Sequence, residues 1–158
     1  MAIEIERKFF VHPEKWEDLQ KPAGENFRQG YLLTDPQKTI RVRQTFDKGF
    51  ITIKGISVGA SRQEFEYEIP HLEAEELLDQ FAVSELSKIR YKILFENHLW
   101  EIDEFLGENE GLILAEIELK SEDEKFNLPD WIAKEVTEEQ KYYNSNLTIN
   151  PYKNWKTS

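Results

Sequence analysis

The chain has 158 residues and a formal net charge of −11, with 39% hydrophobic residues, 32% charged residues and no cysteine. This length predicts one domain over residues 1–158, and the acidic balance disfavours binding to nucleic acid or to an anionic membrane. The lack of cysteine excludes disulfides and thiolate sites, and the lack of a membrane-length apolar run or a signal-peptide pattern predicts a cytoplasmic protein.

Segments that alternate polar and apolar residues with period two predict eight β-strands. Their expected ranges are about 2–11, 26–33, 38–46, 49–56, 62–69, 86–95, 98–105 and 112–120. Short spacers such as "DKG" and "ENH" predict hairpin turns, so the strands are mainly antiparallel. Helical patterns occur at 12–20 and 72–81, and the last forty residues are expected to form short helices and loops. The predicted fold class is α+β.

The first predicted strand, "IEIERKFF", places Glu4, Glu6 and Lys8 on one parity and mainly apolar residues on the other. Successive side chains of a strand point to opposite faces, so these three charges share a face. A solvated face of a half-buried sheet would give the same alternation, and for a single strand that is the ordinary interpretation.

The same alternation recurs in the later strands, where the charged residues are sorted by sign. The basic members are Arg41, Arg43, Lys54, Lys88 and Arg90, and the acidic members are Glu64, Glu66, Asp103, Glu116 and Glu118. Like charges two residues apart repel each other, so repeated carboxylate pairs favour a divalent cation. Repeated arginine and lysine favour a polyanion.

A barrel of about eight strands closed with the charged parity inward would enclose these opposed sets of charges. Burying so many charges without a ligand is costly, so the pattern indicates a site for a metal–polyphosphate complex. Carboxylates suit a hard metal such as Mg²⁺ or Mn²⁺, and the cations suit phosphate oxygens. Such a site positions and stabilises a phosphoryl group and needs no Ser, Cys or His nucleophile.

"EIERK" resembles the Glu-x-Glu-x-Lys signature of the CYTH superfamily, the triphosphate tunnel metalloenzymes. It is followed in order by "RVR", "TIKG", "EFEYEI", "KIRY", "EIDEF" and "AEIELK". The tail "AKEVTEEQKYYNSNLT" also resembles the end of the small bacterial members, with Ala133 where the family usually has glycine.

The resemblance implies an eight-stranded antiparallel tunnel, with a few peripheral helices, that binds triphosphate and Mg²⁺ or Mn²⁺. The metal ligands that it implies are Glu4, Glu6, Glu116 and Glu118, with Asp103 and Glu64 as further ligands. The implied phosphate-binding residues are Lys8, Arg41, Arg43, Lys54, Lys88 and Arg90. Lys88 and Glu66 are also assigned to catalysis, together with Tyr31 as a proton acceptor. A tyrosine of ordinary pKa near 10 is a weak base at pH 7, and the alternative is a barrel-lining aromatic residue.

The expected activity is hydrolysis of a triphosphate, with inorganic tripolyphosphate as the favoured substrate. The alternatives are cyclisation of ATP to cyclic AMP, hydrolysis of nucleoside or thiamine triphosphate, and a non-catalytic polyphosphate sensor. The expected partner is therefore a small-molecule triphosphate, and a homodimer is compatible with the sequence.

Overall fold

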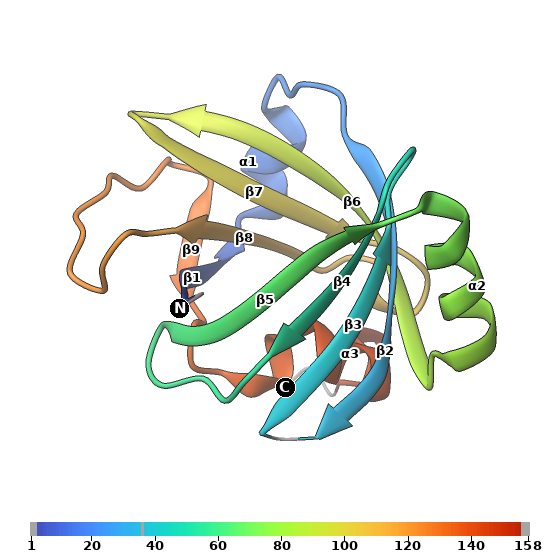
Figure 1. Cartoon of the computed structure of the whole chain (residues 1–158). Helices are drawn as coiled ribbons and strands as arrows, with labels where there is room; N and C mark the ends of the chain where they lie inside the picture. The colour runs from blue at the N-terminus through green and yellow to red at the C-terminus, as the bar shows by residue number, and fades with distance from the viewer. Residues whose placement is uncertain (1–2, 36, 156–158) are drawn as a thin grey trace.

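The computed structural model describes residues 3–35 and 37–155, and within these ranges it forms a β-barrel with peripheral helices (Figure 1). The strands are β1 (Ile3–Val11), β2 (Glu25–Asp35), β3 (Lys38–Gln44), β4 (Gly49–Lys54), β5 (Ser61–Ile69), β6 (Ser84–Phe95), β7 (His98–Phe105), β8 (Ile113–Glu118) and β9 (Ile132–Glu135). The helices are α1 (Pro13–Asp18), α2 (His71–Phe81) and α3 (Asn144–Ile149), with short 3₁₀ turns η1 (Gly107–Asn109), η2 (Gln140–Tyr142) and η3 (Tyr152–Asn154).

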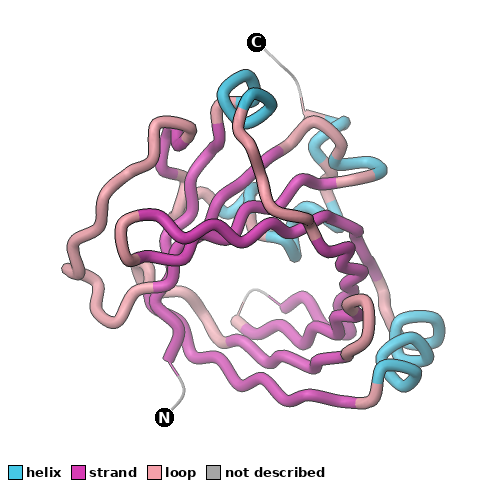
Figure 2. The backbone as a smooth tube through the Cα atoms, turned by 90° about the horizontal axis from the view of Figure 1, so that it is seen from above, coloured by secondary structure: helices cyan, strands magenta, loops and turns pink. Residues whose placement is uncertain are grey.

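The strands follow the order β5-β4-β3-β2-β6-β7-β8-β1, and β1 then pairs with β5 to close the barrel. Figure 2, which looks down on the molecule, shows these strands running around a ring. Every pairing is antiparallel. The predicted closed barrel of eight antiparallel strands with peripheral helices is therefore confirmed, as are the helical patterns that became α1 and α2.

β9 is a correction, because the last forty residues were expected to form only short helices and loops. This strand pairs with the outer end of β1, where Phe9 lies opposite Glu135 and Val11 opposite Ile132. With four residues, it is too short to show a period-two pattern. It extends the sheet beyond the closed barrel and ties the C-terminal segment to β1.

The β6–β7 hairpin shows how a short turn fixes strand register. Its turn residues, Glu96 and Asn97, have φ values of 44° and 70°. Positive φ at both central positions is typical of the type I′ turn, whose twist matches that of the flanking strands. Phe95 is therefore paired with His98, and the alternation continues along both strands.

The barrel carries apolar side chains on its outer surface, and helices and loops cover them. On β1, β7 and β8, the buried side chains of Phe9, Trp100 and Ile117 form one cluster with Trp16 of α1 and with Trp131. Trp16 also donates a hydrogen bond from Nε1 to Glu104 at 2.7 Å. This part of the barrel wall is therefore stabilised by burial of apolar surface on its outside.

Helix α2 covers the outer side of β3 and β4, where Val42, Ala74 and Leu78 are buried together. Two glycines permit this close approach. A Cβ added at Gly30 would lie 2.8 Å from Leu78 Cδ2, and one at Gly49 would lie 2.6 Å from the Cβ of Ala74. The C-terminal segment instead packs on Leu86, Phe105 and Leu114, which are in phase with the inward-facing Lys88, Asp103 and Glu116, so it covers the inner face of the barrel wall. Within the described ranges, none of the helices is long and apolar enough to cross a membrane.

Candidate active site

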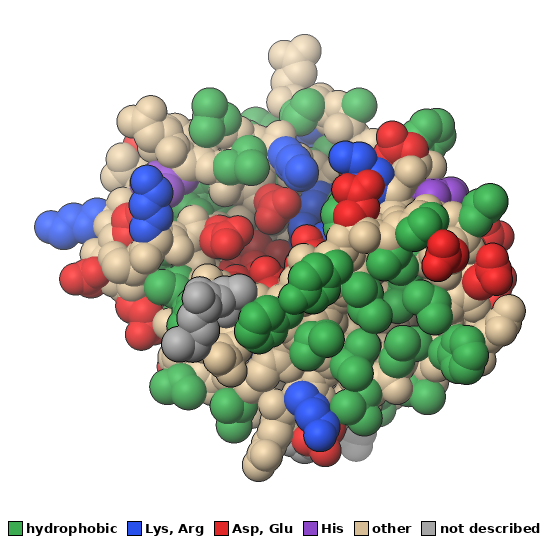
Figure 3. All heavy atoms as spheres, viewed as in Figure 1, with side chains coloured by type: hydrophobic (Ala, Val, Ile, Leu, Met, Phe, Trp, Pro, Cys, Tyr) green, Lys and Arg blue, Asp and Glu red, His purple; other side chains and the backbone are tan. Residues whose placement is uncertain are grey.

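The interior of the barrel holds a cavity of about 590 Å³. Figure 3 views the molecule from a side where acidic and basic side chains gather in a hollow beside a large apolar surface. All but one of the residues that the sequence analysis assigned to the site line this cavity: Glu4, Glu6, Lys8, Tyr31, Arg41, Arg43, Lys54, Glu64, Glu66, Lys88, Arg90, Glu116 and Glu118. The exception is Asp103, which lies behind the cations.

The acidic side of the cavity is built by β1, β7 and β8. The strand register places Glu6 opposite Glu118, and Glu116 opposite both Lys8 and Glu101. Lys8 Nζ lies 3.3 Å from Glu116 Oε2. Burial raises the pKa of Glu116, but Lys8 and Arg90 more than offset this, so the pKa falls well below its usual range. Glu116 is therefore a carboxylate held ionised by the neighbouring cations.

Glu6 and Glu118 differ from Glu116, since neither carboxylate makes a hydrogen bond or ion pair with the described residues. Burial raises the pKa of Glu6 well above the ordinary carboxyl value, and repulsion from Glu116 and Glu4 adds to the effect. Burial also raises the pKa of Glu118, together with Glu4 and Glu101. A cation placed among these carboxylates would relieve this repulsion.

This donor set fits a hard divalent cation, because it presents several carboxylate oxygens to one cavity. As the side chains stand, however, no three His, Cys, Asp or Glu groups in residues 3–35 and 37–155 are close enough together to form a ready-made metal site. The carboxylates of Glu6 and Glu118 have no other partner there to give up. Binding a metal would require side chains on neighbouring strands to converge. Glu4 and Glu116 would in addition have to share or release the cations that they now contact.

The basic side of the cavity is built by β3 and β4. Arg41 donates to Thr52 Oγ1 at 3.1 Å and to Glu66 Oε2 at 3.3 Å, while Arg43 Nη2 lies 3.7 Å from the same Glu66 oxygen. The Nε atoms of both arginines are buried and have no hydrogen-bond partner among the described residues. Burial lowers the pKa of Arg43 to about 10, and Arg41 and Arg90 add to this by repulsion. The two arginines thus bring two positive charges to the cavity wall beside one nearby carboxylate, Glu66.

Aromatic side chains and a neighbouring lysine complete this side. The guanidinium of Arg43 lies 4.9 Å from the ring centroid of Phe27 and 5.6 Å from that of Phe50. Lys54 Nζ lies 3.0 Å from Glu4 and 3.3 Å from Glu64. Lys54 therefore links the β4–β5 side of the cavity to β1, near the pairing that closes the barrel.

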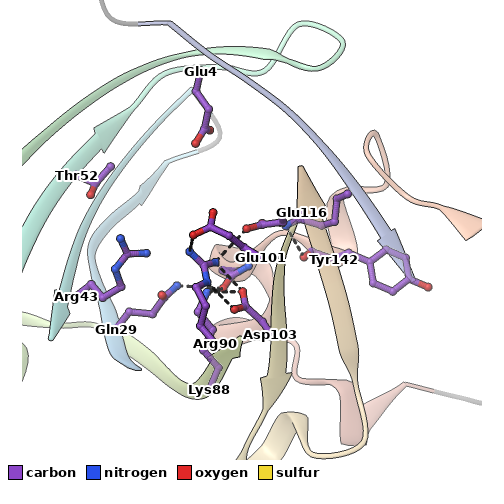
Figure 4. Close-up of polar contacts among 12 residues, drawn as sticks. Glu4, Gln29, Arg43, Thr52, Lys88, Arg90, Glu101, Asp103, Glu116 and Tyr142 are labelled. Atoms are coloured by element: carbon purple, nitrogen blue, oxygen red, sulfur yellow. Dashed lines mark hydrogen bonds and ion pairs between the residues drawn. The ribbon is translucent and has the colours of Figure 1, made fainter. Parts of the chain in front are cut away.

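The third group of charges lies on β6 and β7, around Asp103 (Figure 4). Arg90 donates to both oxygens of this carboxylate, at 2.8 and 2.9 Å, and Lys88 Nζ lies 2.9 Å from Oδ2. Arg90 also reaches Glu101 at 3.3 Å and Glu116 at 3.0 Å. Asp103 is only 2% exposed. In this structure its oxygens therefore face the two basic residues and not the open cavity.

Lys88 is the most deeply buried of these cations, at 1% exposure. Burial lowers its pKa to about 7, although Asp103 acts in the opposite direction. Tyr31 is also buried, and its hydroxyl lies 3.5 Å from Nε2 of Gln29. The structure thus brings Lys88, Glu66 and Tyr31 to one cavity from three different strands.

Several cavity residues were missed by the sequence analysis. Arg62 of β5 has the same parity as Glu64 and Glu66, so the alternation itself could have identified it. Glu101 is likewise in phase with Asp103 on β7. By contrast, Asn144 lies at the start of α3 and lines the cavity from the irregular C-terminal segment, where no periodic signal marks it.

Fold and site together define a closed antiparallel β-barrel whose charged residues face an internal cavity. Residues 2–149 match the model of the CYTH domain. The chain therefore belongs to the CYTH family, as the resemblance of "EIERK" and the following motifs predicts. Membership of this family implies a requirement for a divalent cation without naming the ion.

Two curated relatives are both named inorganic triphosphatase. The protein from Acetivibrio thermocellus is 52% identical over 157 residues, which cover 99% of each chain. The protein from Nitrosomonas europaea is 37% identical over 154 residues, covering 92% of this chain and 97% of its own. A crystal structure of the inorganic triphosphatase NE1496 is also similar, with 33% sequence identity and a TM-score of 0.64, covering 94% of this chain and 96% of that one.

Proposed function

We propose that this protein hydrolyses inorganic tripolyphosphate with the help of Mg²⁺ or Mn²⁺. The observation that carries the proposal is the opposition of acidic and basic residues across one cavity inside the barrel. Two relatives that match nearly the full chain are both named inorganic triphosphatase, and this supports the same activity. A linear polyanion accompanied by a cation is complementary to both sides of such a cavity.

In this proposal, the phosphate oxygens are held by Lys8, Arg41, Arg43, Lys54, Lys88 and Arg90. These cations lie on four strands of the closed sheet, so they are held in place before the substrate arrives. Fixed positive charge stabilises the charge that develops on the transferred phosphoryl group without further reorganisation. Arg41 and Arg43 both line the cavity, so their positive charge acts on an anion that enters it.

The metal ligands in this proposal are Glu4, Glu6, Glu116 and Glu118, with Glu64 beside them. When bound, a divalent metal polarises phosphate oxygens and lowers the pKa of a coordinated water. Asp103 was assigned to the same set, and its hydrogen bonds favour the further role of orienting Lys88 and Arg90.

Glu66 and Tyr31 are proposed to act on the attacking water. Glu66 accepts a hydrogen bond from Thr52 at 2.8 Å and contacts both Arg41 and Arg43. A phosphate group that takes over the two arginines would leave Glu66 free to orient water.

For Tyr31, a fall of kcat by at least about tenfold in Tyr31→Phe supports the role of proton acceptor. An unchanged kcat supports a barrel-lining role instead.

The function is tested by measuring phosphate release from tripolyphosphate, ATP and thiamine triphosphate, each with Mg²⁺, Mn²⁺ or a chelator. We expect metal-dependent release that is fastest with tripolyphosphate. Formation of cyclic AMP from ATP would identify a cyclase, and tight metal-dependent binding without turnover would identify a sensor. Either result would overturn the proposed hydrolysis.

The proposal also includes one domain over residues 1–158, a cytoplasmic location, and no nucleic-acid or membrane partner. A homodimer is compatible with it. Light scattering after gel filtration measures the oligomeric state, and limited proteolysis tests the single domain. Retention of the protein on anionic vesicles or DNA at about 0.15 M salt would contradict the expected lack of these partners.

A further inference from the structure

The C-terminal segment places one polar side chain against Lys88. Lys88 Nζ donates a hydrogen bond to Asn144 Oδ1 at 2.8 Å, on the side chain of the first residue of α3. A lysine ammonium has only donors, so the atom of Asn144 that faces it must be the amide oxygen. Lys88 has one other polar partner among the described residues, Asp103 Oδ2 at 2.9 Å.

These two contacts leave one ammonium proton of Lys88 unused. The side chain also lies against Phe105, with Nζ 5.7 Å from the ring centroid. With a carboxylate, an amide oxygen and an aromatic ring as neighbours, the ammonium has a defined position despite its flexible four-carbon chain. Because Lys88 lines the cavity, the third proton is available to a ligand there.

Gln29 supports Asn144 from the other side. Its side chain is completely buried, and Nε2 donates to the same Asn144 oxygen at 3.1 Å. This orientation leaves Gln29 Oε1 buried with no hydrogen-bond partner in the described part of the chain. A flipped amide would instead place two oxygens against each other. A buried oxygen without a hydrogen bond is unfavourable. Gln29 therefore supports the orientation of Asn144 although its own Oε1 is left without a partner among the described residues.

Buried residues on both sides of Asn144 in the sequence hold this part of the chain against the barrel. Leu147 of the same helix is fully buried and packs in one cluster with Leu86 and Phe105. Tyr142, two residues before Asn144, belongs to the same cluster, and its backbone oxygen accepts a hydrogen bond from Lys8 Nζ at 3.3 Å. The C-terminal segment therefore contacts two of the six cations that are proposed to hold phosphate, Lys8 and Lys88.

We propose that Asn144 is a positioning residue, which holds the Lys88 ammonium so that its third proton meets a phosphate oxygen of the triphosphate. The C-terminal segment is then a part of the active site and not only a cover for the barrel. This inference rests on the proposed triphosphatase function. Asn144 acts through Lys88, and its contribution disappears when Lys88 is absent.

The kinetic test compares Asn144→Leu, which removes the oxygen at similar volume, with Asn144→Asp, which keeps an oxygen at the same place. Asn146→Leu is the matched control, since Asn146 lies on the same helix and bonds to Gln140 O, away from the cavity. We expect Asn144→Leu to lower kcat/KM for tripolyphosphate by at least about tenfold. Asn144→Asp should retain more activity, and Asn146→Leu should match the wild type.

A double-mutant cycle separates positioning from a general structural effect. Adding Asn144→Leu to Lys88→Met should change kcat/KM no further, because the group that Asn144 positions is already lost. An equal loss in both backgrounds would overturn the inference, as would an equal loss in Asn144→Leu and Asn146→Leu. Melting temperatures of all variants show whether each is folded.

A measurement without substrate distinguishes failure of this inference from failure of the proposed function. NMR of lysine side-chain ammonium groups at about pH 6 detects those that are protected from solvent exchange. We expect a protected Lys88 signal, assigned by its absence in Lys88→Met. It should be lost in Asn144→Leu and kept in Asn146→Leu. A Lys88 signal unchanged in Asn144→Leu would overturn the positioning role even if the protein hydrolyses tripolyphosphate.

Discussion

At the scale of single residues, the carboxylates of the cavity differ in what they already hold. Glu116 binds Lys8 and Arg90, and Asp103 binds Lys88 and Arg90. Replacing either one would remove a counter-charge from two buried cations, so loss of activity would be mixed with loss of stability. Glu118 makes no such contact in the described structure, which makes it a cleaner probe of the acidic side.

We therefore expect Glu118→Gln to lower metal-dependent phosphate release from tripolyphosphate by at least about tenfold, since one of the proposed anionic metal ligands is lost. The melting temperature should stay within a few degrees of the wild type. The control is Glu76→Gln on α2, an exposed carboxylate outside the cavity. Wild-type activity of Glu118→Gln across a titration of Mg²⁺ and Mn²⁺ would argue against the proposed ligand set.

Which residues face the cavity could be predicted from the sequence, because period two assigns each side chain to one face of its strand. Arg41 and Arg43 illustrate this success. How deep a residue lies could not be predicted in the same way. Asp103 has the expected parity, but its position behind Lys88 and Arg90 depends on three side chains packing together. Asn144 was missed because it lies on no strand.

At the scale of elements, β3 combines the binding site and the core in neighbouring residues. Val42 is completely buried under α2, while Arg41 faces the cavity. Val42→Ala should lower the free energy of unfolding by about 2 kcal/mol through the cavity that it leaves, with little change in KM. Chemical denaturation and steady-state kinetics measure the two effects.

Arg41→Met should show the opposite result. Its loss removes a charged hydrogen-bond donor from the proposed phosphate site, so KM for tripolyphosphate should rise by about tenfold or more. The free energy of unfolding should change less than in Val42→Ala. If the two variants changed stability and KM alike, alternate residues of β3 would not face different environments.

The short strand β9 is attached to β1 by an ion pair on the outside of the barrel. Arg7 donates two hydrogen bonds to Glu135, at 2.8 and 2.6 Å. The hydrogen bond from Arg7 holds the pKa of Glu135 below its ordinary value, although burial opposes it. A carboxyl whose pKa is lowered by folding adds stability above its unfolded pKa, and this stability is lost as the pH falls through the folded pKa.

Glu135→Gln should therefore lower the free energy of unfolding at pH 7 by about 0.5–1 kcal/mol, because the pair is partly exposed. The difference from the wild type should shrink once the pH falls below the ordinary carboxyl range, where Glu135 is protonated in both states. Urea denaturation of both proteins at several pH values measures it. A constant difference at all pH values would mean that the charge of Glu135 is not the cause.

At the scale of the whole molecule, the barrel has its charges inside and much of its apolar surface outside. The inner cations are only partly matched, as the unpaired Nε atoms of Arg41 and Arg43 show. A polyanion that binds the folded state alone should therefore stabilise the protein even without metal. At a concentration about 100 times its Kd, such a ligand adds about 2.7 kcal/mol.

For a chain of this length, that gain corresponds to a rise in melting temperature of about 5–10 °C. We expect this rise with tripolyphosphate in the presence of a chelator, and a smaller rise with orthophosphate, which reaches fewer cations. Arg41→Met should reduce the effect. Differential scanning fluorimetry measures it, and equal shifts with the two anions would indicate that the cavity does not recognise a chain of phosphates.

The closed ring also explains why the overall architecture could be predicted but not its outer parts. Eight alternating segments and their short turns leave few ways to arrange an antiparallel sheet, and the buried charges require it to close around them. The position of β9, by contrast, depends on contacts such as that between Arg7 and Glu135, which lie 128 positions apart in the chain.

The two-residue turn at Glu96 and Asn97 sets the register of β6 against β7, and this register decides which side chains enter the barrel. If β6 slipped by one position against β7, hydrocarbon would enter the lumen and ammonium groups would be pressed against tryptophan. Such a misaligned barrel would lose its core and its chemistry in the same event. A misaligned molecule would therefore be unstable as well as inactive. The charged side chains that line the cavity thus also favour the correct strand register during folding.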